Sequence, residues 1–206
     1  DKLYASKLVL KYPILGGSVT AGSEYTYTYR KDQYVNDEGY IPNSFTTIQE
    51  DNINAFIEYL YPFKFGSISA GVRYEHLAFN YYEDDVRQDS QSRKFNDFYP
   101  SISFNAHKGK FMFQLNYATK TSRPSYSLLS NAVTYIDRYS YTKGNPYLIP
   151  EINHDLSLAT VWNFLQFAAT YQVTQNAIVH LGTHQEGNEN GILLYNTNFD
   201  RDIPTL

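Results

Sequence analysis

The residues of this 206-residue chain best suited to chemistry are its five histidines and a short acidic run. His180 and His184 are four residues apart, a ligand spacing for a metal on a helix. The surrounding alternation instead predicts a strand, on which residues four apart are separated by about 13 Å. His154 and Glu151 lie close in sequence and fit a hydrogen-bonded pair at the end of a strand. Neither pair predicts a metal site or a catalytic site.

The acidic run offers carboxylate oxygens of the kind that calcium prefers: Glu83, Asp84 and Asp85, with Asp89 nearby. It lacks the glycine and the spaced ligands of an EF-hand loop, so a solvated acidic loop is the simpler interpretation. The sequence has no nucleophile elbow, glycine-rich phosphate loop or paired-carboxylate motif. It also has no cysteine, which excludes thiolate and disulfide chemistry. We therefore predict no enzymatic activity, no cofactor and no metal.

These residues lie on predicted strands, because apolar and polar residues alternate over most of the chain. Successive side chains of a strand point to opposite faces, so the alternation separates an apolar face from a polar one. The pattern is clearest at 111–118, whereas Pro100 inside another strand predicts an edge or a bulge. Arg73 and Glu75 share a polar face, where ordinary cross-strand pairing is expected. We predict an all-β, antiparallel up-and-down meander of about nine long strands, within residues 2–12, 18–30, 45–61, 67–82, 98–105, 111–118, 156–162, 165–174 and 192–199.

The connections between these strands alternate in length. Short turns are expected near 13–17, 62–66, 107–110 and 162–164, and longer loops at 32–43, 83–94, 122–154 and 182–191. Outer-membrane barrels have this arrangement, with short periplasmic turns and longer extracellular loops. Several strands also reach the length of about ten residues that a tilted strand needs to cross a bilayer. The sequence therefore predicts part of a larger transmembrane β-barrel. A β-sandwich is the alternative, but its strands would be shorter, about six residues.

The composition agrees with a sheet that has one face in lipid and the other in water. The mean hydropathy is −0.48, although 17% of the residues are aromatic, with 21 tyrosines and 13 phenylalanines. A net charge of −4 gives no electrostatic reason to bind nucleic acid. No apolar run approaches the ~18 residues of a membrane helix, and no signal peptide is visible. From the termini, Asp1 and Leu206, we expect an excised single segment, residues 1–206, of a larger barrel.

The longest interruption of the alternation runs from Ser122 to His154. Gly-Asn-Pro at 144–146 predicts a turn, because glycine accepts positive φ and proline restricts both itself and its predecessor. A loop of this length is functional or disordered, and its many tyrosines argue against disorder. We expect it to fold into the rim of the barrel or over a plug domain. Stacking of its tyrosines on a sugar, or contact with a peptide, is the alternative.

Several motifs follow one another in this region: Arg-Pro-Ser-Tyr at 123–126, Tyr-Ser-Tyr at 139–141 and Gly-Asn-Pro at 144–146, then Pro150, Glu151 and His154. Asn-Phe-Asp-Arg at 198–201 is a weaker downstream motif. In this order and spacing they resemble the late-barrel segment of TonB-dependent outer-membrane receptors. The residues predicted from this resemblance to be structural, or to face the plug or the solute, are Arg123, Pro124, Tyr126, Tyr139, Tyr141, Gly144, Asn145, Pro146, Pro150, Glu151 and His154.

The resemblance implies a cell outer-membrane location and a role in the active uptake of a large solute. It also implies partners: outer-membrane lipid, the receptor's own plug domain, a TonB-type energy coupler and an unknown solute. The chain itself would supply barrel wall and extracellular loops. The plug and the remaining strands would lie outside it, so we expect the isolated segment to self-associate through its open edges. The alternative function, from another class, is a secreted or surface β-sandwich module that binds glycans.

Overall fold

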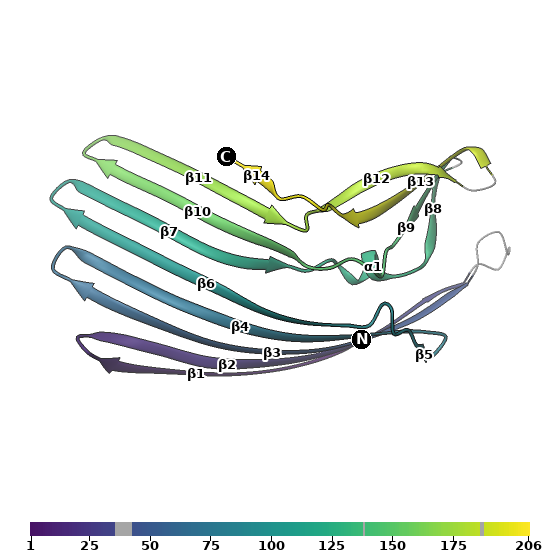
Figure 1. The fold of residues 1–206 in the computed structure, drawn as a ribbon, viewed down its shortest axis with the longest axis horizontal. Helices are drawn as coiled ribbons and strands as arrows, with labels where there is room; N and C mark the ends of the chain where they lie inside the picture. Colours follow the sequence, from purple (N-terminus) through teal and green to yellow (C-terminus); the bar gives the residue numbers. More distant parts are fainter. Residues whose placement is uncertain (36–42, 138, 186–187) are drawn as a thin grey trace.

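The computed structural model describes residues 1–35, 43–137, 139–185 and 188–206, and most of them lie in strands (Figure 1). Eight long antiparallel strands form one curved sheet, which we call the wall. The described residues contain no helix that is long and apolar enough to cross a membrane. The wall strands are β1 (Lys2–Ile14), β2 (Gly17–Tyr34), β3 (Ser44–Phe63), β4 (Gly66–Glu83), β6 (Arg93–Lys108), β7 (Phe111–Ser122), β10 (Glu151–Trp162) and β11 (Leu165–Gln175).

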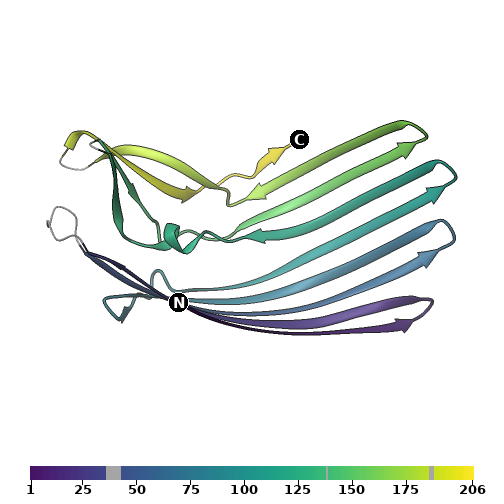
Figure 2. The same ribbon diagram turned by 180° about the vertical axis from the view of Figure 1, so that it is seen from behind.

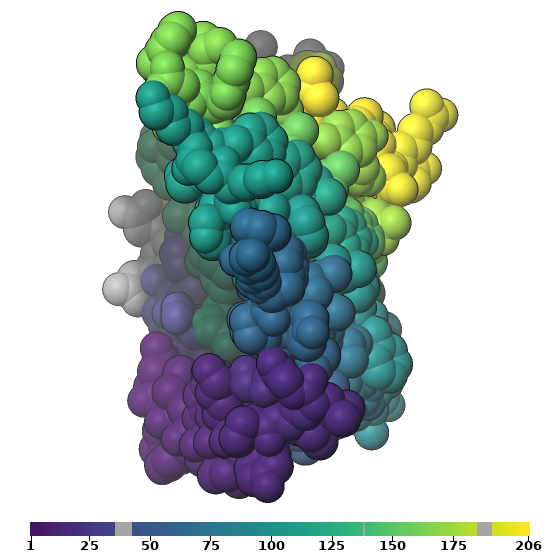
Figure 3. All heavy atoms as spheres, turned by 90° about the vertical axis from the view of Figure 1, so that its left-hand side faces the viewer, coloured from purple at the N-terminus to yellow at the C-terminus, as the bar shows by residue number. Residues whose placement is uncertain are grey.

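Four two-residue turns join the wall strands into hairpins at one end of the sheet. Leu15 and Gly16 both have positive φ, 51° and 76°, as do Gly109 and Asn163 in two of the other turns. Such turns suit hairpins because their backbone twist matches that of the strands. Figure 3 looks onto this end, where the hairpins follow one another in chain order from β1 and β2 to β10 and β11. All four short connections predicted from the sequence are therefore confirmed.

The cross-strand register separates the two faces of the wall cleanly. On the apolar face, Ile102 of β6 lies opposite Ala70 of β4 and Tyr117 of β7. One residue further along, on the polar face, Ser103 lies opposite Ser69 and Asn116. The apolar face is uncovered: the side chain of Ile102 is 52% exposed. A packed soluble sheet would bury these residues, so the alternation predicted from the sequence is present without a core on that side.

Aromatic side chains border the apolar face at both ends of the strands. Near the short turns, the ring centroids of Phe63 and Phe104 lie 5.9 Å apart, and those of Phe104 and Phe113 also 5.9 Å apart. Toward the other end, Tyr74 and Phe98 pack with centroids 5.1 Å apart. Two aromatic rows around an apolar band are the arrangement of a strand sheet that crosses a bilayer.

A second, four-stranded sheet projects beyond the long-loop end of the wall (Figures 1 and 2). Its strands are β8 (Val133–Asp137), β9 (Ser140–Lys143), β12 (Ile178–Gln185) and β13 (Asn188–Asn198). The short helix α1 (Tyr126–Leu129) precedes it. We call residues 123–150 together with β12 and β13 the cap. Within the cap, β9 and β13 pair in parallel, whereas all other strand pairs are antiparallel.

The small hydrophobic core lies where the cap meets the polar face of the wall. Ile48 and Tyr81 of the wall are fully buried, and Leu148 of the cap is 2% exposed. Phe79 and Leu129 complete the cluster. The apolar contacts of this chain are therefore concentrated under residues 123–150, for which the sequence predicts a loop.

The structure differs from the expected strands at two places. Residues 192–199, predicted as the ninth strand of the meander, belong to β13 in the cap, and β14 (Ile203–Thr205) pairs with β11 instead. The loop predicted at 182–191 is largely strand, because β12 and β13 form a hairpin, with 186–187 outside the described residues. Of the loop predicted at 32–43, residues 36–42 also lie outside the described residues.

The ladder between β6 and β7 stops at Ser101 and Ala118, one residue after Pro100. Beyond this point β6 pairs only with β4. Proline has no backbone N–H to donate to a ladder, so it fits a place where a strand becomes an edge. The prediction of an edge at Pro100 is therefore confirmed.

Candidate functional site

The cap is held to the wall by a buried ion-pair cluster. Glu50 of β3 and Glu75 of β4 both lie on the polar face, each 7% exposed. Arg123 lies between them: its Nη1 donates to Glu50 Oε1 at 2.8 Å and its Nη2 donates to Glu75 Oε1 at 2.5 Å. One guanidinium thus joins two strands of the wall to the first residue of the cap. A planar guanidinium suits this role because its fixed donors can serve two carboxylates at once.

The electrostatics of this cluster depend on burial. Glu50 lies beyond the apolar band, since the next outward-facing residue, Asp51, is polar and accepts a hydrogen bond from Tyr25 at 2.8 Å. Desolvation raises the pKa of the Glu50 carboxyl, and the nearby positive charge of Arg123 opposes this rise. The hydroxyl of Tyr126 adds a long contact of 3.5 Å to Glu50 Oε2. The groups that lower the pKa of Glu50 against the effect of burial therefore belong to the cap.

A second arginine holds the middle of the cap. The guanidinium of Arg93 in β6 donates to the carbonyl oxygens of Pro146, Tyr147 and Leu148 at 2.7, 2.6 and 2.8 Å. These three carbonyls belong to a turn without regular structure, so the arginine supplies donors that a helix or a ladder would otherwise provide. Burial of this guanidinium lowers its pKa.

Two asparagines join the parts of the cap to one another. Asn145 Nδ2 donates to the carbonyl of Asn196 at 2.9 Å, and Asn145 Oδ1 accepts from the amide of Tyr147 at 2.9 Å. Asn198 makes three backbone contacts: its Oδ1 accepts from the amide of Ile149 at 2.9 Å, and its Nδ2 donates to the carbonyls of Ile149 and Asn176 at 2.9 and 2.7 Å. The Gly-Asn-Pro and Asn-Phe-Asp-Arg motifs are thereby joined in space.

The other motif residues divide between packing and exposure. A Cβ at Gly144 would collide with the carbonyl oxygen of Ser130, so only glycine fits there. Pro124 and Pro150 line a narrow apolar crevice between cap and wall. The ring of Tyr141 packs edge-on against Tyr135, with centroids 5.7 Å apart. Tyr139 is 51% exposed at the outer side of the cap.

The expected pairing of His154 with Glu151 is wrong. The two residues are three apart on β10, so their side chains point to opposite faces. His154 Nδ1 lies 3.0 Å from the hydroxyl of Tyr117. Glu151 Oε1 accepts a hydrogen bond from the amide of Ile178 at 2.6 Å, where β12 begins. Glu151 therefore belongs to the attachment of the cap, and His154 belongs to the aromatic border of the apolar face.

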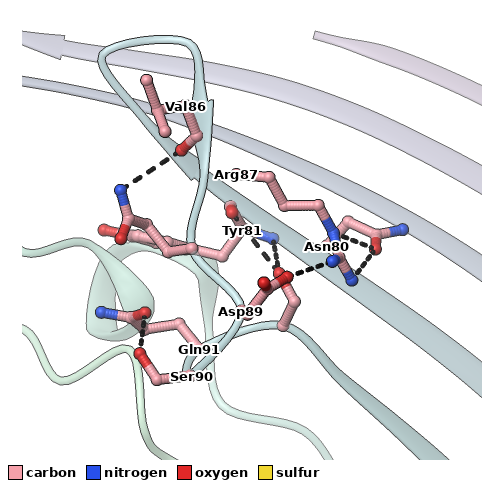
Figure 4. A network of polar contacts seen from close by, with 9 residues as sticks. Asn80, Tyr81, Val86, Arg87, Asp89, Ser90 and Gln91 are labelled. Atoms are coloured by element: carbon pink, nitrogen blue, oxygen red, sulfur yellow. Dashed lines mark hydrogen bonds and ion pairs between the residues drawn. The ribbon is translucent and has the colours of Figure 1, made fainter.

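The residues of the acidic run form a tight hairpin in place of the predicted loop. Asp84 and Asp85 have positive φ, 51° and 61°, and join β4 to the short strand β5 (Val86–Arg87). Figure 4 shows Arg87 between Asn80 and Asp89: Nε and Nη2 lie 3.3 and 3.2 Å from Asn80 Oδ1, and Nη1 contacts the carboxylate of Asp89. Within the described ranges, no group of three or more acidic or histidine side chains could hold a metal ion.

The remaining candidates from the sequence are two histidines and one pair of charged residues. His180 and His184 both lie on β12, and His180 Nδ1 is 2.8 Å from Asn196 Oδ1. Arg73 makes the expected cross-strand contact, since its guanidinium lies 5.9 Å from the ring centroid of its neighbour Phe56. Glu75 on the same face binds Arg123 of the cap instead. Neither Glu50 nor Arg93 is predicted as a site residue from the sequence. On its face of β3, Glu50 is one of two acidic residues among polar and apolar neighbours, so no local pattern distinguishes it.

The polar face also carries an open groove of about 400 Å³ beside the ion-pair cluster. Arg73, Glu75, Tyr99 and Lys120 are among its lining residues. Both charge signs and a tyrosine face this groove, so it can bind a polar solute through hydrogen bonds and ring contacts. It contains no nucleophile–base pair with the geometry of a catalytic site.

The model of the outer membrane protein beta-barrel family matches residues 4–203. Among solved structures, the fold is similar to the Serratia marcescens hemophore receptor HasR, described as a double mutant in complex with its hemophore HasA and heme. The TM-score is 0.66 and the sequence identity is 14%, with 98% of this chain and 38% of that chain covered. The chain thus spans well under half of the receptor that it resembles. No curated protein sequence matches it.

Proposed function

The chain belongs to the outer membrane protein beta-barrel family, and from this premise we propose that it forms wall and cap of a TonB-dependent receptor that takes up a large solute. It is an outer-membrane protein and an antiparallel part of a larger barrel. Its apolar face is the lipid face and its polar face lines the lumen. The short turns then lie in the periplasm and the cap lies at the extracellular end.

The observation that carries this proposal is the attachment of the cap to the lumen side of the wall. A simple pore would leave its extracellular loops free, or folded on one another. Here Arg123 and Arg93 fix the cap over the polar face through contacts with side chains and backbone. An entrance with a fixed shape is what a receptor needs in order to select a solute before transport, because preorganised sites bind at lower entropic cost.

The glycan-binding β-sandwich has no support in this geometry. A sandwich packs a second sheet on the apolar face of the first. In the part of the chain that the structure describes, nothing covers that face: Phe98, Trp162 and Phe167 are 68%, 64% and 58% exposed. The four-stranded sheet lies beyond the end of the wall, and the parts of the cap that pack against the polar side do so through Leu129 and Leu148.

The proposed partners beyond lipid follow from the receptor interpretation. We propose that a plug domain fills the lumen beside the open groove, and that a TonB-type protein supplies energy from the inner membrane. Transport, not catalysis, is the proposed activity. The solute is one large enough to require a barrel with a plugged lumen, and its first contacts would be made by the cap.

The test compares two deletion strains of the source organism: one without the gene for the complete protein and one without the TonB-type coupler. Each strain is grown on a panel of iron complexes, cofactors, peptides and oligosaccharides as sole source of the limiting nutrient. We expect both strains to fail on the same solute, and the gene without residues 123–150 to give no rescue although its product reaches the outer membrane. Growth of the first strain on every solute that the second strain cannot use would refute the proposal.

A further inference from the structure

The short-turn end of the wall carries charge of one sign. Within three residues of the four two-residue turns, that is 12–19, 61–68, 106–113 and 160–167, the sequence has three lysines and no aspartate or glutamate. The lysines are Lys64, Lys108 and Lys110. The acidic hairpin at 83–89 lies at the opposite end of the wall. The two ends of the barrel wall therefore differ in charge.

Two of these lysines, Lys64 and Lys108, lie close to the ring of Phe65. Lys64 Nζ lies 5.3 Å from the centroid of the Phe65 ring, and Lys108 Nζ lies 5.9 Å from the same centroid. Phe65 is itself 43% exposed. Lys110 occupies the adjoining turn, where its carbonyl accepts a hydrogen bond from the amide of Asn163 at 3.1 Å. Neighbouring turns thus bring two ammonium groups to one ring, with a third lysine in the adjoining turn.

No anion of the protein neutralises these charges. Among the described residues, the eight ion pairs involve other cations, and none joins a carboxylate to Lys64, Lys108 or Lys110. The ammonium groups of Lys64 and Lys108 over the Phe65 ring repel each other, and a shared anionic ligand removes this repulsion. The cluster therefore favours an external anion.

The same cluster borders an apolar groove on the lipid face. Lys108, Phe111, Trp162 and Leu165 form one continuous cross-strand row, so the lysine is directly beside the aromatic residues. Phe111, Trp162, Leu165 and Phe167 line the groove. A cationic group at the end of an apolar groove matches a molecule with an anionic head and a hydrocarbon chain. Long lysine side chains reach the interface in this way while their stems stay on apolar surface.

We propose that this lysine rim, defined by Lys64, Phe65, Lys108 and Lys110, binds the phosphate headgroup of an anionic phospholipid in the periplasmic leaflet. One acyl chain lies along the groove of Phe111, Trp162 and Phe167. The inference rests on the outer-membrane location and on the short turns lying in the periplasm. It does not depend on the identity of the solute. A bound lipid at this place would fix the height of the barrel in the bilayer.

The test uses the complete barrel protein that carries this chain, purified in detergent and titrated with lipid in native mass spectrometry. Phosphatidylglycerol and phosphatidylcholine with identical acyl chains are the two probes. We expect wild type to bind phosphatidylglycerol at least about tenfold more tightly than phosphatidylcholine. The triple variant Lys64→Gln, Lys108→Gln, Lys110→Gln should lose this preference. The matched triple variant Lys2→Gln, Lys31→Gln, Lys94→Gln, with the same loss of charge at the other end, should keep it.

Three results would overturn the proposal. Equal binding of the two lipids by wild type would exclude recognition of the headgroup. Equal losses in the two triple variants would reduce the effect to net charge. Displacement of the lipid by millimolar inorganic phosphate would indicate a free-anion site instead of a lipid site. Heat-modifiable migration on gels shows whether each variant is folded. A triple variant that does not fold is replaced by the three variants that each carry one of its substitutions.

Discussion

The wall and the cap are stabilised in different ways, although they belong to one continuous chain. The wall is held by backbone hydrogen-bond ladders that run along strands of up to 20 residues. Its side chains are mainly apolar on one face and mainly polar on the other. The cap has short strands of four or five residues between Val133 and Lys143 and depends on individual side chains that bind backbone groups. A repeating pattern therefore determines the wall, whereas a few specific residues determine the cap. Substitutions should therefore act differently in the two regions.

The largest effect is expected from Arg123→Ala. This change leaves Glu50 and Glu75 buried without their cation, and breaking a buried pair costs about 3–5 kcal/mol. The cap should open, with faster hydrogen exchange of residues 123–149 in the reconstituted barrel, while exchange in β7 and β10 stays slow. The control is Lys120→Ala, which breaks an exposed ion pair with Asp155 and should cost less than about 1 kcal/mol. Equal exchange in the two variants would show that Arg123 does not hold the cap.

The next effect separates the two faces of the wall. Ile102→Arg places a charge on the lipid face near the middle of the apolar band, which costs about 2–4 kcal/mol in a barrel. Ser103→Arg places the same side chain on the lumen face and should be close to neutral. Urea unfolding of the complete barrel in lipid vesicles measures both. If the two variants lose equal stability, the faces are assigned wrongly.

Asn198→Ala should have an intermediate effect confined to the cap. It removes both partners of Ile149 and one partner of the Asn176 carbonyl, and each buried group left unsatisfied costs about 1–3 kcal/mol. Asn198→Asp keeps the acceptor for the Ile149 amide but loses the donor, so its exchange rates should fall between those of wild type and the alanine variant. Limited proteolysis within the cap provides an independent measurement. An aspartate variant more labile than the alanine variant would contradict this account.

The smallest effect is expected at a turn of the wall. Asn163 has a φ of 56°, a conformation that alanine adopts at a cost of about 1 kcal/mol. Asn163→Ala should therefore lower the stability slightly, and Asn163→Gly should leave it nearly unchanged. Urea unfolding in vesicles again reports the difference. A larger loss for glycine than for alanine would exclude backbone conformation as the reason for asparagine at this turn.

The same contrast explains what could be predicted from the sequence. Alternation and turn residues were sufficient for the wall, including the edge at Pro100, because each strand carries its own local signal. The cap has no such signal. Arg93 binds carbonyls more than 50 residues away in the sequence, and Glu50 meets Arg123 only after β3, β4 and the cap are folded together. Even the strand at 192–199, found correctly as a strand, was placed in the wrong sheet because no local pattern distinguishes cap from wall.

The parallel pairing of β9 with β13 also has a consequence for the order of folding. Each hairpin of the wall joins residues that are neighbours in the sequence, so the wall can grow hairpin by hairpin as the chain is delivered to the membrane. Residues 140–143 instead wait for residues 192–195, which arrive only after β10, β11 and β12. Closing so long a loop is slow, because its entropic cost precedes any contact that compensates for it. The small sheet of the cap is therefore expected to form after the wall hairpins of this chain.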